Sequence, residues 1–299
     1  MIPNYESFYN SILNFLNDKN ERKVNEIVDF CVQKHQVTNE ERLKNYESSG
    51  VNIVYSRVHW ALTYLKMAKL IENVKKGTYK ITNDGIKAMH DDIDNKYLKK
   101  YPSFIEFTKR IKKNKQRINE DSNDNSTDSP EDRMDEAYQE KKEKLISELL
   151  DTLMNNITSM QFEHLVNRLL SKMNYGIAEN TKTTGDGGID GIIKADKFGF
   201  EKIYVQAKQW KSKVSSPEID KFSGAMDKFA LSSPKGVFIT TSEFTYDAEE
   251  SVRQNKNKQI VLIDGRKLAE LMIEYGMGVE LKEEYKIYDI NTDFFEDLN

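Results

Sequence analysis

The sequence is poor in the residues that build common metal sites and in the apolar runs that enter membranes. It has one cysteine and four histidines in 299 residues, and no cysteine–histidine pair has metal-ligand spacing, which argues against a zinc or HNH-type site. The single Cys31 excludes an internal disulfide, and we expect it in a helical core. No apolar run approaches the roughly 20 residues of a membrane span, and no secretory signal is visible. We therefore expect a cytoplasmic protein without a membrane partner.

The chain also lacks an overall excess of positive charge. Its formal net charge is −4 at pH 7, which by itself argues against a nucleic-acid partner. Local charge, however, decides whether a surface binds phosphate. Residues 1–117 carry a net +8, from 22 basic and 14 acidic residues, whereas residues 118–140 carry −8. Residues 141–279 carry +1 and residues 280–299 carry −5, so the N-terminal region is the basic one.

A polar stretch divides the chain. Residues 119–130, NEDSNDNSTDSP, have too few apolar side chains to bury surface, and they predict a flexible linker. The organisation that follows is an N-terminal domain in residues 1–117, an acidic flexible linker in 118–140, a second domain in 141–280 and an acidic tail in 281–299.

The N-terminal part is predicted to form helices followed by a β-hairpin. Its third helix, for example, repeats Val54, Val58, Leu62 and Leu65 on one face. The expected helices cover residues 5–16, 22–34 and 53–69, and the expected strands cover 70–71 and 79–82. The strands flank a turn that contains Gly77, and three helices followed by such a hairpin form a winged helix.

The second part alternates between strands and helices, which predicts an α/β domain with a central mixed sheet and helices on both sides. Helices are expected over residues 145–153, 161–173, 217–231, 246–255 and 266–275, and strands over 176–182, 188–195, 201–208, 237–241 and 260–264. Ser216 is the expected N-cap of the third of these helices, with Pro217 at its first position. With the winged helix, the chain is α+β overall.

Two neighbouring strands carry a polar group of residues. Asp190 follows a glycine pair in the strand GGIDGII, and the next strand ends in Gln206-Ala207-Lys208. Gln206 and Lys208 are two residues apart and point to the same face of a strand. A hairpin with its turn at residues 196–200 places Asp190 opposite Gln206, because both are equally far from residue 198.

These residue types fit Mg²⁺-assisted phosphodiester hydrolysis. Mg²⁺ prefers hard oxygen ligands, which Asp190 and the Gln206 amide supply, and the Ala207 backbone carbonyl is a further candidate ligand. An ammonium such as that of Lys208 stabilises charge on a phosphate and positions the attacking water. The alternative reading is an exposed strand end whose Asp, Gln and Lys only make it soluble.

The second domain resembles the catalytic domain of the Mrr family of restriction endonucleases. The resemblance rests on TTGDGGIDGIIKAD, IYVQAKQWKSKVSSPEIDKFSGAM, KGVFITTSEFTYDAEESV and IVLIDGRKLAELM, which follow in order. The N-terminal half resembles the Mrr N-terminal domain through SRVHWALTYLKMAKLIENVKKGTYKITNDG. The family has the PD-(D/E)xK nuclease fold, here in the branch where glutamine replaces the acidic residue before the lysine. The resemblance therefore implies a restriction-endonuclease-like α/β/α domain.

The resemblance also implies roles for four residues. Asp190 and Gln206 would bind the metal, Lys208 would be the catalytic lysine, and Glu163 would be a further metal-binding carboxylate on the preceding helix. Mg²⁺ is the implied cofactor, and Mn²⁺ is its expected substitute. Because the amide of Gln206 removes one negative charge from the site, we expect weaker metal binding and a single ion. The alternative for Glu163 is an ordinary exposed helix carboxylate.

Other residues are candidates for DNA binding. The third N-terminal helix is the expected reader of a groove, with Arg57 and Lys66 on its polar face, and the wing lysines Lys75, Lys76 and Lys80 would contact phosphates. Beyond the catalytic strand, Lys211 and Ser216 would meet the DNA backbone. Simple helix capping also explains Ser216, and winged helices also serve as protein-contact modules.

The resemblance thus predicts a type IV-like enzyme that cuts double-stranded, modified DNA. One active site per chain predicts a homodimer or larger homo-oligomer for cutting both strands. Two alternatives stay open. One is a repair or junction-processing nuclease of the same fold, and the other is a non-enzymatic DNA-binding regulator.

Overall fold

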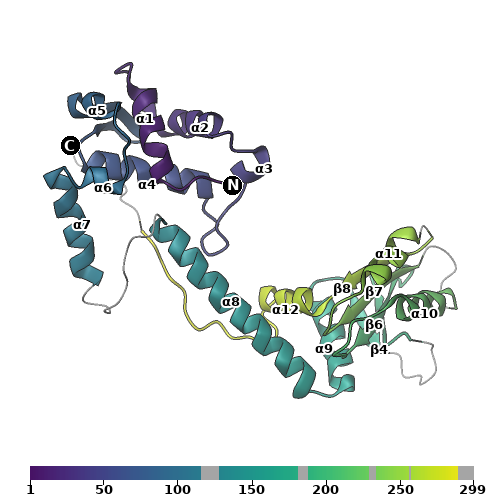
Figure 1. Ribbon diagram of the computed structural model, residues 1–299. Helices are drawn as coiled ribbons and strands as arrows, with labels where there is room; N and C mark the ends of the chain where they lie inside the picture. Colours follow the sequence, from purple (N-terminus) through teal and green to yellow (C-terminus); the bar gives the residue numbers. More distant parts are fainter. Residues whose placement is uncertain (116–127, 181–187, 229–233, 256, 289–299) are drawn as a thin grey trace. The chain divides into compact units, whose positions relative to one another are not determined.

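The structure, a computed structural model, describes residues 1–115, 128–180, 188–228, 234–255 and 257–288. The chain forms two compact units, Met1–Lys141 and Lys142–Ile287, which are treated one at a time below. Figure 1 shows the first unit as mainly helical and the second as a sheet covered by helices.

The first unit has the order of elements expected for a winged helix. Its elements are η1 (Glu6–Phe8), α1 (Tyr9–Leu16), β1 (Arg22–Lys23), α2 (Val24–Lys34), α3 (Asn39–Arg42), α4 (Ile53–Met67), β2 (Ile71–Lys75), β3 (Thr78–Ile81), α5 (Asn83–Ala88), α6 (Asn95–Leu98) and α7 (Pro102–Lys115). The predicted hairpin is confirmed as the antiparallel pair β2–β3. Strand β1 was not predicted, because its two residues are too few to show alternation.

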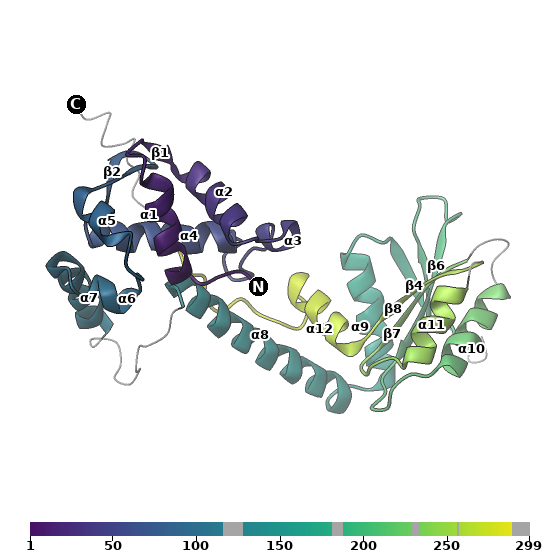
Figure 2. The same ribbon diagram turned by 45° about the horizontal axis from the view of Figure 1, so that its top comes forward.

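The core of this unit lies between α1, α2, α4 and the small sheet (Figure 2). The predicted apolar face of α4 is confirmed, since Val58, Leu62 and Leu65 are fully buried. Cys31 is also fully buried, and burial raises the pKa of its thiol to about 12. A thiol in this state is not a nucleophile at neutral pH, in agreement with its expected place in the core.

Part of the segment predicted to be a flexible linker is helical, because helix α8 spans Pro130–Asn155. Residues 130–140, expected to be flexible, form its first turns. The reason is a local start signal: the Asp132 amide donates to Ser129 Oγ at 3.1 Å, and the Ser129 amide donates to Asp132 Oδ2 at 2.9 Å. Pro130 at the helix start and two acidic residues in the first turn favour the same boundary. Residues 118–127 of the expected linker lie outside the described residues.

The second unit is built from the remaining turns of α8 and a five-stranded sheet with its helices. The elements are α9 (Ser159–Lys172), β4 (Ile177–Asn180), β5 (Gly191–Lys194), β6 (Lys202–Lys208), α10 (Ser216–Asp227), β7 (Lys235–Thr240), α11 (Tyr246–Gln254), β8 (Gln259–Ile263) and α12 (Gly265–Glu274). The strand order is β4-β5-β6-β7-β8. Strands β4, β5 and β6 pair antiparallel, whereas β6, β7 and β8 pair parallel, which confirms the predicted mixed sheet.

Helices cover both faces of this sheet (Figure 1), and a separate hydrophobic core lies on each face. Residues of α8, α9 and α12 pack on one face, together with Val205 and Ala207 of β6. Residues of α10 and α11 pack on the other face, together with Tyr204 of β6 and Phe238 of β7. The α/β/α layering therefore agrees with the fold expected from the sequence. Among the described helices of both units, none is long and apolar enough to cross a membrane.

Candidate active site and DNA-binding residues

The β5–β6 hairpin has the predicted register. Gly191 pairs with Val205 and Ile192 with Tyr204, and the Asp190 amide donates to the Val205 carbonyl at 2.8 Å. Asp190 therefore lies beside Gln206 at the open end of the hairpin. This register confirms that the two parts of the motif meet.

The Asp190 carboxylate is held by two donors from β6. The Gln206 side-chain Nε2 and the Ala207 backbone N–H, at 2.9 Å, both donate to Asp190 Oδ2. Gln206 is only 2% exposed, so its amide is fixed beneath the carboxylate. These contacts orient Asp190 but also direct the Gln206 nitrogen, not its oxygen, toward it. To place both oxygens on one cation, the amide of Gln206 would have to turn over.

The glycine before Asp190 makes room for Gln206. Gly188 has a φ of +117°, and a Cβ at this position would lie 2.6 Å from Gln206 Oε1. Gly188 therefore has a role inside the protein, because only glycine fits both the backbone angle and the space. Asp186 and Gly187, which precede Gly188 in the sequence, lie outside the described residues.

Lys208 is the last residue of β6 and lies beside Thr240 of β7. Its Nζ is 5.4 Å from the ring centroid of Trp210, within the range of a cation–π contact. Trp210 itself packs against the core on the α10 side of the sheet. This supports a packing role for Trp210, and it gives the lysine ammonium a defined neighbour.

Glu163, on α9, is close enough to the hairpin for charges to interact. Burial and the charge of Asp190 raise the pKa of Glu163, while His164 and Lys208 oppose the rise. Burial likewise raises the pKa of Asp190, against the Ala207 hydrogen bond, the Lys208 charge and the Gln206 hydrogen bond. A carboxylate whose charge is disfavoured by burial and by a neighbouring carboxylate is a setting in which a divalent cation is stabilising.

The donor set fits a hard cation. Glu163, Asp190 and Gln206 offer carboxylate and amide oxygens, the ligands that Mg²⁺ and Mn²⁺ take in proteins. In the part of the chain that the structure describes, no three His, Cys, Asp or Glu side chains form a metal-binding group. Among these described residues, the Gln206 side-chain amide is the oxygen donor available beside the carboxylates of Glu163 and Asp190.

Four of the predicted DNA-binding residues lie at the surface of the first unit. Lys66 is exposed in the last turn of α4, and Lys75 and Lys76 are exposed on the wing. Lys75 Nζ is 3.8 Å from Glu21 Oε2, an exposed pair that contributes little to stability. Lys80, on β3, is half-buried. The basic wing is therefore accessible to a phosphate backbone.

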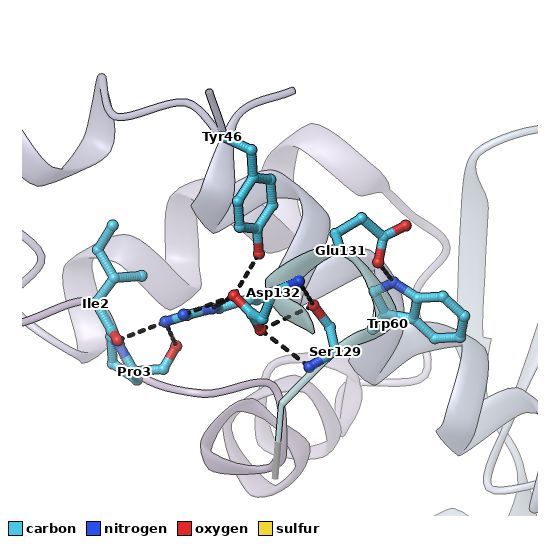
Figure 3. A network of polar contacts seen from close by, with 8 residues as sticks. Ile2, Pro3, Tyr46, Trp60, Ser129, Glu131 and Asp132 are labelled. Atoms are coloured by element: carbon cyan, nitrogen blue, oxygen red, sulfur yellow. Dashed lines mark hydrogen bonds and ion pairs between the residues drawn. The ribbon is translucent and has the colours of Figure 1, made fainter. Parts of the chain in front are cut away.

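Arg57 is placed differently from the prediction. Its guanidinium donates to Asp132 Oδ1, and its Nη1 also donates to the backbone carbonyls of Ile2 at 2.7 Å and Pro3 at 3.1 Å. Figure 3 shows Tyr46 and Ser129 converging on the same Asp132 carboxylate. This is a correction: Arg57 joins α4 to the start of α8 and is not presented to a DNA groove. Spacing on α4 could not reveal this, because the partner is 75 residues away.

Lys211 and Ser216, the two predicted DNA-binding residues that follow β6, differ in whether they are available to DNA. Lys211 is exposed. Ser216 is not the N-cap of α10, because Ser215 holds that position and Ser216 is the first helical residue. The Ser216 hydroxyl donates to Asp220 Oδ2 at 3.2 Å, and Ser216 shares a shallow hollow with Asp247 and Glu250. These carboxylates repel phosphate, so the structure removes Ser216 from the DNA-binding candidates.

Two polar residues near the site are not among those predicted from the sequence. Asn167 is 5% exposed, and a Cβ on Gly191 would lie 2.5 Å from its Oδ1, so the Asn167 side chain packs against the backbone that follows Asp190. Gln209 forms three side-chain hydrogen bonds with the α8–α9 region. The only signal for Asn167 is its polar character on an apolar helix face, four residues after Glu163, and Gln209 has none.

Comparisons with known proteins match both units. Residues 154–272 match a family model described as a restriction endonuclease, and residues 5–91 match one described as the Mrr N-terminal domain. The chain is 30% identical over 308 aligned residues to the type IV methyl-directed restriction enzyme EcoKMrr of Escherichia coli (strain K12), covering 99% of each. A solved structure of MspJI restriction endonuclease with a 27-mer oligonucleotide matches 44% of this chain and 31% of its own, at 20% identity and a TM-score of 0.34.

Proposed function

This chain belongs to the Mrr family of restriction endonucleases, and on that premise we propose that it cuts double-stranded, methylated DNA with Mg²⁺, which Mn²⁺ can replace. The observation that carries the proposal is the joining of Asp190, Gln206 and Lys208 at one end of the β5–β6 hairpin. The carboxyl group of Glu163 lies within range of their charges. We place the reaction in the cytoplasm, where foreign DNA arrives.

Asp190, Glu163 and Gln206 are the residues that would hold the cation. A divalent ion held there would supply polarisation of a phosphate oxygen and a lower pKa of the attacking water. Asp190 keeps its orientation through the Ala207 amide even when the side chain of Gln206 turns over to offer its oxygen. Because Gln206 is neutral, the site has two carboxylates in place of three, which favours one ion over two.

Lys208 acts on the phosphate and the attacking water. Its ammonium extends from the end of β6 and stabilises negative charge as it grows on the phosphate oxygens. Its contact with Trp210 limits the positions that this flexible side chain takes. Lys211, exposed three residues later, is suited to hold the DNA backbone beside the reacting bond.

DNA recognition is assigned to the winged-helix unit. Lys66 of α4 and the wing residues Lys75, Lys76 and Lys80 supply phosphate contacts. With Arg57 bound to Asp132, the exposed side of α4 that remains for base contacts includes Tyr55, which is 37% exposed. The preference for methylated DNA is inferred from the similarity to the Escherichia coli enzyme, which is described as methyl-directed. A homodimer or larger homo-oligomer would provide one site for each strand.

Digestion of a matched set of plasmids tests this function. Methylated and unmethylated copies of one plasmid, and a branched DNA, are incubated with wild type, Asp190→Ala and Lys228→Ala in Mg²⁺. Lys228→Ala is the control, because this exposed lysine follows α10 away from the site. We expect wild type and the control to linearise only the methylated plasmid and Asp190→Ala to cut nothing. Cleavage of branched DNA regardless of methylation would indicate a repair or junction nuclease, and no cleavage by wild type would indicate a non-enzymatic regulator.

A further inference from the structure

The residue that follows the catalytic lysine is bound to a different part of the molecule. Gln209 Nε2 donates to the backbone carbonyls of Leu153 at 2.7 Å and of Ile157 at 2.8 Å. Its Oε1 accepts a hydrogen bond from the Ser159 hydroxyl at 2.9 Å. One side chain next to Lys208 therefore has both ends of its amide occupied.

These three partners mark the point where α8 ends and α9 begins. Leu153 lies in the last turn of α8, where carbonyl groups have no partner within the helix. Ile157 is in the connection, and Ser159 is the first residue of α9. Thr158 caps α9 through a capping box with Gln161, which fixes where the helix starts. Gln209 thus joins the end of β6 to a defined helix start.

Glu163 lies one turn further along this helix. Ser159 and Glu163 are four residues apart, so they share one face of α9 and are separated by about 6 Å along its axis. Phe162 and Val166, both fully buried, hold the same segment against the sheet. Apolar packing sets the depth of a helix on a sheet but permits sliding along it, whereas directed hydrogen bonds do not.

We propose that Gln209 is a positioning residue that sets Glu163 against Asp190 and Lys208. It touches no substrate. It joins the strand that carries Gln206 and Lys208 to the helix that carries Glu163, so that the carboxylate arrives at the cation site in register. This inference rests on the proposed function of Glu163 as a metal-binding residue.

A double-mutant cycle on metal binding tests the inference. Mn²⁺ affinity is measured calorimetrically, without DNA, for wild type, Gln209→Met, Glu163→Gln and the double variant. Methionine keeps the length of glutamine and removes its donors. If Gln209 acts through Glu163, Gln209→Met weakens Mn²⁺ binding by at least about threefold when Glu163 is present. In the Glu163→Gln background, the same substitution weakens Mn²⁺ binding by less than about 1.5-fold. An equal loss in both backgrounds, or no loss in either, overturns the proposal.

Cleavage of DNA supplies the second readout. We expect Gln209→Met to lower kcat about tenfold and to leave KM for DNA within about twofold, because a misplaced ligand impairs the reaction and not the binding of DNA. Gln254→Met, on α11, is the matched control and should equal wild type. If Gln209→Met does not fold, Ser159→Ala removes one of the three hydrogen bonds and takes its place in the same cycle.

The two proposals fail in different ways. If wild type cuts DNA and binds Mn²⁺ through Asp190, but Gln209→Met matches wild type, only the positioning role is overturned. If wild type does not cut DNA, and the Asp190→Ala variant binds Mn²⁺ as tightly as wild type, the proposed function fails. The role of Gln209 then fails with it.

Discussion

Asp132 accepts two hydrogen bonds from the guanidinium of Arg57, at 2.8 Å from Nη2 and 3.1 Å from Nε. The side chains are 7% and 20% exposed, so this is a largely buried ion pair. Removing one partner leaves the other charge without compensation. We predict that Asp132→Ala destabilises the first unit by about 3–5 kcal/mol, measured by chemical denaturation. Asp151→Ala, an exposed site on the same helix, should stay within about 0.5 kcal/mol of wild type.

The same pair predicts how this stability depends on pH. Burial alone raises the pKa of Asp132, but hydrogen bonds from Arg57, Tyr46 and Ser129 outweigh it and hold this pKa below its usual range. A carboxylate whose pKa is lower in the folded than in the unfolded protein stabilises the fold at pH values above the unfolded pKa, which is about 3.9 for Asp. This stabilisation is lost as the pH falls from there through the folded-state pKa. The difference between wild type and Asp132→Ala should therefore be full at pH 7 and shrink below about pH 4. A constant difference down to pH 3 would contradict the assignment.

Gly188→Ala should impair the nuclease while the second unit stays folded. The new Cβ would lie 2.6 Å from Gln206 Oε1, at a backbone φ of +117°. We expect cleavage to fall at least about tenfold, because the amide beneath Asp190 must move. Gly224→Ala is the matched control, since a Cβ there meets nothing within 4 Å, and alanine favours its helix. Equal activity of the two variants would show that the contact with Gly188 is unimportant.

Gln206→Glu tests whether this residue limits metal binding. The substitution restores a third carboxylate beside Asp190 and removes the donor that now binds it. We expect Mn²⁺ affinity to rise at least about threefold, because ligand charge strengthens binding of a hard cation. Without metal, the melting temperature should fall, because two carboxylates then face each other. Unchanged affinity, measured by calorimetric titration, would argue against Gln206 as a ligand.

Lys66 of α4 and the wing lysines should determine the salt dependence of DNA binding. Each phosphate contact that is lost reduces the slope of log K against log salt by about 0.9. We expect Lys66→Ala and Lys75→Ala each to lower the slope by about that amount in fluorescence anisotropy titrations. Arg57→Ala should leave the slope unchanged and lower the melting temperature instead. A reduced slope for Arg57→Ala would restore it as a DNA contact.

Sequence periodicity predicted the parts of this protein that depend on local pattern. The buried face of α4 follows from the spacing of Val58, Leu62 and Leu65. The register of the β5–β6 hairpin follows from a short turn, because Asp190 and Gln206 are equally distant from it. The alternation of strands and helices predicted the mixed sheet, which is confirmed. Sequence motifs such as GGIDG and QAK predicted the restriction endonuclease family, which is also confirmed.

Contacts between distant residues were not predictable in this way. Arg57 has the sequence appearance of a DNA contact, yet its partner Asp132 is supplied by a segment expected to be flexible. Gln209 likewise appears as a polar residue at a strand end, and only the fold brings Leu153 and Ser159 to it. Polar residues satisfied by long-range partners have no periodicity, so their roles depend on the tertiary structure.

The most direct test of the account compares wild type and Lys208→Ala in single-turnover cleavage of methylated plasmid with Mg²⁺. DNA affinity is measured on the same proteins, with Lys228→Ala as the control. We predict that Lys208→Ala binds DNA within about twofold of wild type but cuts at least about a hundredfold more slowly, because it lacks the charge that stabilises the reacting phosphate. Cleavage by Lys208→Ala at the wild-type rate would contradict the assignment of the active site.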